Sequence, residues 1–284
     1  MPELPEVQHV CESLAAHVLG KTVRSVRIYR PDVVRGLAQS AALLRGDRIA
    51  NIMRHGKQIA LVTSPTDAGR PCVCIHLGMS GSLQYRPTSS SRRLEPHTHV
   101  SWTFADSGRL LFIDPRRFGG IWTFPDRARL WTDRWQDLGP DALSITPKNL
   151  HQAFQHTSRC LKSALLDQRL IAGLGNIYVD ELLFACRLHP LTRCNGLPKE
   201  HLTTLVRRMR RLLNRAIRSG GSTVRSYVNS NGREGRFQQQ HHVYARAGLP
   251  CSACGCDLSS KVIAGRTTVF CGQCQRFVNG PLLI

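Results

Sequence analysis

Four cysteines near the C-terminus place the strongest constraint on the fold of this chain. They form two Cys-x2-Cys pairs with sixteen residues between the pairs: Cys251, Cys254, Cys271 and Cys274. Each pair can supply two thiolates from a tight turn, and four thiolates complete the closed, tetrahedral set of a structural zinc site. We therefore expect one structural Zn²⁺ ion in a small finger, with a β-hairpin between the pairs. Cys256 lies too close to Cys254 to join the set.

The charge of the chain indicates an anionic partner. Its 284 residues include 39 Lys and Arg against 19 Asp and Glu, a formal net charge of +20. A soluble polyanion is the expected partner, and nucleic acid is the leading candidate. No apolar run approaches the ~18–20 residues that span a bilayer, and the first residues are acidic rather than apolar. We expect a cytoplasmic, nucleoid-associated monomer with no membrane partner and with free thiols.

The N-terminus carries a possible nucleophile. If Met1 is removed, Pro2 presents a secondary amine, and an α-amine is neutral at a lower pH than a Lys ammonium. Such an amine can attack an aldehyde-level carbon to form an iminium, which acts as an electron sink. Glu3 and Glu6 lie within four residues and could move protons. Taken alone, these residues are more typical of a first helical turn than of a catalytic site.

The pattern of apolar residues predicts an α+β protein. A helix runs from Pro5 to about Leu19, and short β-like runs follow at 22–28, 58–62, 73–76, 99–104 and 110–113. We expect an N-terminal β-sandwich with this leading helix as domain 1–124, and a linker at 125–140. Helical periodicity then fills 146–219 and ends at a Gly- and Asn-rich loop, 222–240. The finger occupies 241–280.

Other motifs are weak when taken singly. Gly173-Leu174-Gly175-Asn176 joins two helices and could admit a phosphate at a helix N-terminus, although such turns are common. Met79 and Phe118 stand in turn-like segments and could either pack in a core or wedge between base pairs. Lys57 taken alone is a surface lysine. A row of arginines along one helix is either solvated or binds phosphates: Arg208, Arg211, Arg215 and Arg218.

Taken together, the motifs closely resemble those of the formamidopyrimidine-DNA glycosylases, which are base-excision repair enzymes. They occur in the family's order over nearly the whole chain: PELPEV (2–7), HGK (55–57), HLGMSGSL (76–83), DPRRFG (114–119), LDQRLIAGLGNIYVDELLF (166–184) and GRTTVFCGQCQ (265–275). The resemblance implies that domain 141–240 is a helix–two-turn–helix DNA-binding domain with a lesion-recognition loop. It also implies a bifunctional glycosylase and AP lyase whose partner is double-stranded DNA with oxidised bases or abasic sites.

The resemblance implies a role for each matching residue. Pro2 forms the Schiff base with C1′ of the damaged nucleotide, and Glu3 is the general acid/base. Lys57 acts in β-elimination and Arg266 in δ-elimination. The implied DNA contacts are Asn176 and Arg266 on phosphates, Met79, Arg116 and Phe118 in the gap left by the flipped base, and His97.

The chain departs from the family pattern at a few positions. Thr157 stands where a basic residue is usual, so Arg159, the nearest cation, is the expected phosphate contact there. Ala245 and Leu249 replace a usual Gly and Glu beside the expected lesion loop. The segments PELPEV and DPRRFG favour oxidised purines over the oxidised pyrimidines of the endonuclease VIII branch. A non-catalytic damaged-DNA-binding protein and a zinc-ribbon regulator also stay open as interpretations.

Overall fold

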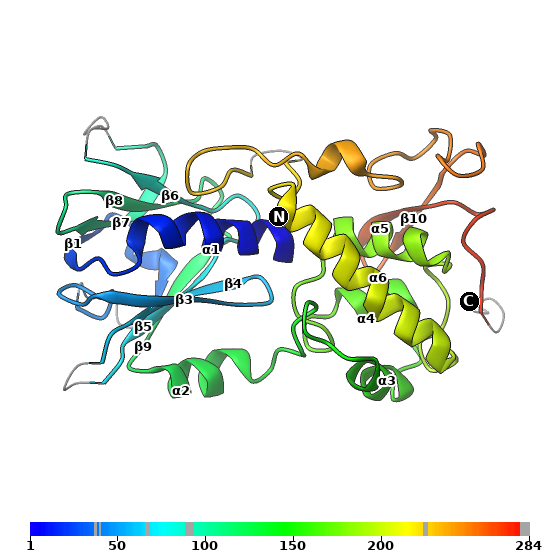
Figure 1. Ribbon diagram of the computed structural model, residues 1–284, viewed down its shortest axis with the longest axis horizontal. Coiled ribbons are helices and arrows are strands. Elements are labelled where there is room, and N and C mark those ends of the chain that lie inside the picture. Colours follow the sequence, from blue (N-terminus) through cyan, green and yellow to red (C-terminus); the bar gives the residue numbers. More distant parts are fainter. Residues whose placement is uncertain (37–38, 40, 66–68, 89–93, 224–226, 279–284) are drawn as a thin grey trace. The chain divides into compact units, whose positions relative to one another are not determined.

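The computed structural model describes residues 1–36, 39, 41–65, 69–88, 94–223 and 227–278 (Figure 1). The mixed α+β class expected from the sequence is confirmed. The chain forms two compact units: Met1–Asp137 with Ser219–Gln238, and Leu138–Arg218 with Gln239–Ile284. Within the described residues, no helix combines the length and the apolar character that a membrane span requires.

Two β-sheets build the first unit. The four-stranded antiparallel sheet has the order β1 (Val23–Ile28), β7 (Thr98–Phe104), β8 (Arg109–Ile113), β6 (Ser82–Arg86). The five-stranded sheet has the order β2 (Val34–Arg35), β9 (Gly120–Phe124), β5 (Cys72–His76), β4 (Gln58–Thr63), β3 (Ile49–His55), in which only β2–β9 is a parallel pair among the described strands. A short 3₁₀ turn, Pro31–Val33, precedes β2. One apolar core includes residues of both sheets and of the first helix.

The sequence locates five of these strands to within about a residue but not β2, β3, β6 or β9. Residues 125–140, expected to be a linker, contain the helix α2 (Arg127–Leu130) and a π-helical turn, Trp131–Trp135. Both elements belong to the first unit. The indole of Trp135 is almost fully buried, and its Nε1 donates to Gln58 Oε1 at 3.3 Å. This contact fastens the turn to the five-stranded sheet.

Helix α1 (Leu4–Val18) starts at the expected place because its first turn is well satisfied. Pro5 needs no N–H partner there, and the Glu6 carboxylate accepts the Glu3 backbone N–H at 2.8 Å. Val7, Val10 and Leu14 are fully buried at helical spacing and fasten α1 to the core. The helix ends just before Gly20, whose φ of 76° suits glycine.

The segment 219–238 lies along α1 in the first unit (Figure 1). The sequence pattern groups this loop with the helical domain, and its residues 224–226 lie outside the described part of the chain. The segment is fastened by contacts at helical spacing: the Ser222 N–H to Glu6 at 2.7 Å, Asn229 to His9 at 3.1 Å, Ser230 to Ser13 at 2.7 Å, and Asn231 to His17 at 2.8 Å. One face of α1 therefore positions the loop.

The second unit consists of helices and a hairpin. Its helices are α3 (Pro147–Gln155), α4 (Leu161–Leu166), α5 (Asn176–Cys186) and α6 (Lys199–Arg218), and its hairpin pairs β10 (Ser259–Ile263) with β11 (Arg266–Phe270). A 3₁₀ turn, Phe237–Gln240, joins the two units along the chain. Helix α6 buries the expected apolar stripe and exposes the row formed by Arg208, Arg211, Arg215 and Arg218. Helix α5 contacts α4, α6 and β11.

Candidate active site and metal-binding cluster

The N-terminal residues that could supply a nucleophile and an acid/base lie at the start of α1. Pro2 is buried, and Glu3 is only 3% exposed. Glu6 accepts N–H groups from both Glu3 and Ser222, so its carboxylate joins the N-terminus to the segment 219–238. The Pro2 nitrogen becomes an amine only when Met1 is removed, and the site then combines an amine with an adjacent buried carboxyl group.

Lys57 lies in the tight turn between β3 and β4, where Gly56 adopts a φ of 55°. The lysine is only 7% exposed, so it is not the surface lysine that its sequence context alone suggests. Arg54 donates to the Gly56 carbonyl at 2.8 Å and to Gln8 of α1 at 2.7 Å. The arginine thereby ties the turn that carries Lys57 to the helix that begins at the N-terminus.

His76 is a further candidate, to which the sequence motifs assign no role. It pairs across the sheet with Gln58, and its pKa is lowered to about 4 by burial and by the charges of Arg134 and Lys57. The imidazole is therefore neutral at pH 7. Its Nδ1 accepts the Gly78 N–H at 3.3 Å, which makes Nε2 the protonated nitrogen. The neutral His76 imidazole thus carries an Nε2–H donor close enough to Lys57 to be affected by the charge of that lysine.

Asp114 organises the loops that carry the expected wedge residues. Its carboxylate is fully buried and accepts the Ser80 hydroxyl at 2.6 Å and the Gly119 N–H at 2.7 Å. Its backbone N–H donates to the His97 carbonyl at 3.1 Å. Gly78 completes the arrangement, since an added Cβ would come within 2.4 Å of Gly119 N. Three loops therefore meet around one residue, Asp114.

The residues carried by these loops point outward. Met79 is 38% exposed and Phe118 is 54% exposed, so neither is the core residue that each could have been on sequence grounds. The Arg116 guanidinium lies 4.5 Å from the centre of the Phe118 ring. His97 is exposed and has a φ of 61°. The first unit thus presents two apolar side chains, a stacked guanidinium and an imidazole on adjoining loops.

The second unit connects Asn176 with the hairpin. Asn176 begins α5, and its Nδ2 donates to the Thr267 carbonyl at 2.8 Å, next to the exposed Arg266. Its Oδ1 accepts from Lys162 Nζ at 2.6 Å. The side-chain amide is therefore held from both ends, and within the described residues its second N–H has no partner and can donate to an anion.

A buried ion pair supports this arrangement. Lys162 Nζ and Asp180 Oδ1 lie 2.6 Å apart, and both side chains are fully buried. The other Asp180 oxygen accepts the Val269 N–H of β11 at 3.1 Å, so the pair joins α4, α5 and the hairpin. Burial raises the pKa of Asp180 to about 6, and Lys162 opposes that rise. Removing one partner alone would leave an uncompensated buried charge.

Arg159 is occupied within the protein. Its Nη1 lies 3.0 Å from Asp167 Oδ2, and its Nε donates to Thr157 Oγ1 at 3.1 Å. Asp167 also binds Arg169. Hydrogen bonds from Arg169, which has the larger effect, and from Arg159 lower the pKa of Asp167 to about 2. A phosphate contact by Arg159 would compete with this ion pair.

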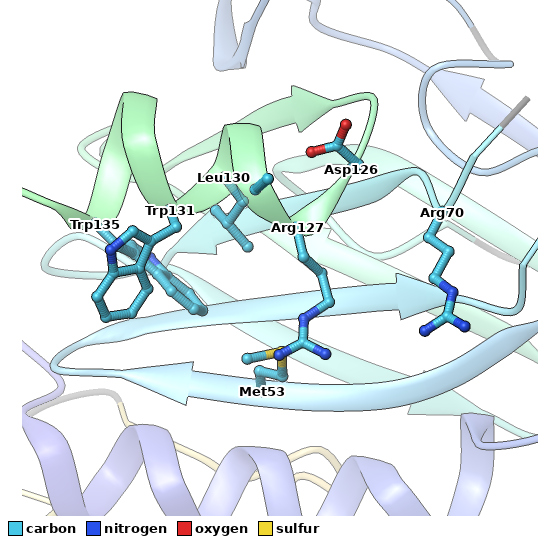
Figure 2. A pocket seen from close by; sticks show the side chains of 8 residues that line it. Met53, Arg70, Asp126, Arg127, Leu130, Trp131 and Trp135 are labelled. Atoms are coloured by element: carbon cyan, nitrogen blue, oxygen red, sulfur yellow. The ribbon is translucent and has the colours of Figure 1, made fainter.

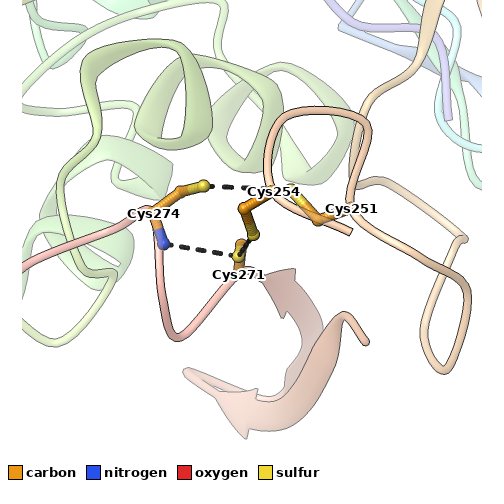
Figure 3. Close-up of side chains that lie close together, drawn as sticks. All are labelled: Cys251, Cys254, Cys271 and Cys274. Carbon is orange, nitrogen blue, oxygen red and sulfur yellow. Dashed lines mark hydrogen bonds between the residues drawn. The ribbon is translucent and has the colours of Figure 1, made fainter. Parts of the chain in front are cut away.

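The four cysteines singled out by their spacing converge in space (Figure 3). Their sulfur atoms all lie within 4.8 Å of one another, with 3.9 Å between Cys251 and Cys274 and 3.5 Å between Cys254 and Cys271. Zn–S bonds of about 2.3 Å in a tetrahedron place sulfurs about 3.8 Å apart, so the spacing fits one metal ion. The cluster can bind a metal, as expected. Cys256 is exposed and outside this group.

Comparisons with known proteins agree with this geometry. The model of the formamidopyrimidine-DNA glycosylase N-terminal domain matches residues 1–121, and the model of the family's H2TH domain matches residues 138–228. Formamidopyrimidine-DNA glycosylases of Bacillus anthracis and Bacillus subtilis are 37% and 39% identical over 280 residues, covering 97% of this chain and 99% of theirs.

Solved structures give the same result. The MutM (Fpg) protein of Thermus thermophilus superposes with a TM-score of 0.84 at 37% identity, over 96% of this chain and 98% of its own. A Lactococcus lactis Fpg in complex with an abasic site containing DNA gives a TM-score of 0.85 at 31% identity, over 96% and 99% of the two chains. The chain therefore belongs to the formamidopyrimidine-DNA glycosylase family.

Proposed function

We propose that this chain removes oxidised purines from double-stranded DNA and then nicks the strand, with Pro2 as the nucleophile. The family to which it belongs consists of DNA glycosylases with AP lyase activity. The observation that carries the proposal is the match to these enzymes over 97% of the chain, with the N-terminal family model beginning at residue 1. Relatives from Lactococcus lactis have been crystallised with Fapy-dG containing DNA and with abasic DNA.

The proposed chemistry begins at the Pro2 amine. Its lone pair attacks C1′ of the damaged nucleotide, and the base leaves with the electrons of the glycosidic bond. Glu3, buried beside Pro2, moves the protons that base loss and sugar-ring opening require. The resulting iminium acidifies the C2′ proton, so the 3′ phosphate leaves in β-elimination and the 5′ phosphate leaves in δ-elimination.

Cations stabilise the departing phosphates in this proposal. Lys57 serves β-elimination, and its low exposure limits solvation of the ammonium. Arg266 serves δ-elimination and binds the same phosphate as Asn176. The two residues lie close together because Asn176 donates to the carbonyl of Thr267, the neighbour of Arg266. The neutral His76 donates from Nε2 to a phosphate near Lys57. Arg159 stays a weaker candidate, because it must first leave Asp167.

The exposed loops fill the space that the flipped nucleotide leaves. Met79 and Phe118 enter as apolar wedges, and Arg116 meets the base left opposite. His97 contacts the adjoining backbone. In this proposal the segment 219–238, which is fastened near the N-terminus by the Ser222 N–H on Glu6, contacts the extruded base.

The metal at the four cysteines is zinc in this proposal, because a thiolate-only tetrahedron is a typical structural zinc set. The ion closes the finger and takes no part in the reaction. We also place the protein in the cytoplasm on the nucleoid, where its DNA substrate is found. A preference for oxidised pyrimidines and a non-catalytic role are both less well supported, since the relatives are formamidopyrimidine-DNA glycosylases.

Borohydride trapping on a duplex with an abasic site tests the nucleophile. Reduction of the Schiff base should yield a covalent adduct whose peptide begins at Pro2. Protein that retains Met1 should trap at least about a hundredfold less, because its Pro2 nitrogen is an amide. Lys57→Ala should still trap. An adduct on Lys57, or equal trapping with Met1 retained, would contradict the assignment.

Elemental analysis tests the metal. We expect one zinc per chain, and Cys271→Ser should lose it together with hairpin structure, because metal binding supplies folding energy to such a finger. Cys256→Ser is the matched control and should retain the ion. The proposal fails if active enzyme contains no zinc or if the two variants bind zinc equally.

Excision opposite different bases tests Arg116. Cytosine presents acceptors at N3 and O2 to the donor fork of a guanidinium, whereas adenine presents a donor at N6. The mismatch costs about 1–3 kcal/mol, which corresponds to roughly five- to 160-fold in rate. The lesion opposite cytosine should therefore be excised faster.

Arg116→Ala should compress that ratio, as measured by single-turnover kinetics on the two duplexes. Arg117→Ala is the control, because Arg117 is paired with Asp32 at the surface. Equal rates in the parent enzyme, or an unchanged ratio in Arg116→Ala, would exclude this role.

A further inference from the structure

A groove in the first unit belongs to none of the chemistry above. It has a volume of about 480 Å³ and is lined by residues of β3, α2, the π-helical turn and Arg70 (Figure 2). The lining residues are Met53, Arg70, Asp126, Arg127, Ala128, Leu130, Trp131 and Trp135. Its volume lies within the range of ligand pockets.

The π-helical turn gives the groove its aromatic wall. The Gln136 N–H donates to the Trp131 carbonyl at 2.8 Å, which closes the wide five-residue ring. Such turns are rare and often occur at functional sites. The turn buries Trp135 to 2% exposure yet leaves Trp131 53% exposed. The exposed Trp131 indole therefore offers apolar surface that a binding partner could bury.

The two indoles form an apolar corner. Their ring centres are 6.2 Å apart and their planes are 84° to each other. His55 packs against both rings, at 5.6 Å from Trp131 and 5.5 Å from Trp135, and so fixes the angle between them. In Figure 2, Met53 lies on the strand beneath the aromatic wall. Because Trp135 is buried, the apolar surface that a partner side chain could cover here is that of the exposed Trp131.

The other side of the groove is basic. Arg70 and Arg127 are exposed, and their guanidinium groups extend over the same strands (Figure 2). Among the described residues, neither forms an ion pair. Asp126 also lines the groove, but its carboxylate caps α2 by accepting the Arg129 N–H at 2.8 Å. Within the described part of the chain, two unpaired cations thus face one engaged carboxylate.

We propose that this groove binds an acidic peptide segment of a partner protein through one large apolar side chain. The side chain packs on the exposed Trp131 indole, and flanking carboxylates pair with Arg70 and Arg127. Single-stranded nucleic acid fits less well, because it needs successive open aromatic faces. Here Trp135 is buried and Trp131 leans on its neighbours.

Fluorescence anisotropy with a labelled peptide tests the proposal. The probe is a short peptide in which aspartates alternate with phenylalanine and leucine, at about 0.15 M salt to suppress long-range attraction. It should bind the full chain at least tenfold more tightly than the same peptide with alanine for phenylalanine and leucine. Trp131→Ala and Arg127→Glu should each weaken binding at least tenfold.

Arg129→Glu is the matched control, since Arg129 lies on the same helix but outside the groove lining. It should bind the peptide within about twofold of the parent. All three variants should excise a lesion at parental rates, which shows that they are folded. Equal binding of the alanine peptide, or equal loss in Arg129→Glu, would overturn the proposal. Tighter binding of a short oligothymidylate that is lost in Trp131→Ala would also overturn it in favour of nucleic acid.

Discussion

Buried carboxylates that accept backbone N–H groups hold in place the loops that carry the candidate site residues. Glu6 binds the Glu3 and Ser222 N–H groups, and Asp114 binds that of Gly119. In the second unit, Glu181 accepts the N–H groups of residues 242, 243 and 244. A carboxylate can accept several hydrogen bonds at once, and charge-assisted bonds are stronger than neutral ones. Loops without regular structure can therefore present side chains in a fixed arrangement.

This principle explains how the chain tolerates exposed apolar residues and buried charges. Met79 and Phe118 are exposed, so their own packing does not hold their loops in place. Asp114 fixes those loops instead. The Lys162–Asp180 pair is costly to bury, but both ions also bind neighbouring groups, Asn176 and Val269. These bonds offset the desolvation cost of the pair, which lies where α4 and α5 meet the hairpin that carries Arg266.

Much of the fold and of the candidate site is predictable from the sequence, because the local signals are strong. The cysteine spacing locates the metal cluster, and the N-terminal motif locates α1 and the residues around Pro2. Asp114 and Asp180 lie within matched motifs, but the motifs do not reveal what these residues bind. Asp114 accepts from the Ser80 hydroxyl, 34 residues away in the chain, and Asp180 accepts from the Val269 N–H, 89 residues away. Residues 125–140 resemble a linker because two short helical elements are below the length at which periodicity is visible. The segment 219–238 packs on α1 through contacts more than 200 residues apart in the chain.

Amide hydrogen exchange in an Asp114→Asn variant tests the role of these carboxylates most directly. The neutral amide has one oxygen to accept with and turns its NH₂ group toward either the Ser80 hydroxyl or the Gly119 N–H, so the loops should open more often. We predict that the Gly119 amide exchanges at least tenfold faster than in the parent, as do the amides of Arg116 and Arg117 in the same loop. The amides of β7 and β8 should stay protected. Unchanged exchange at Gly119, or loss of protection throughout the sheet, would contradict the account.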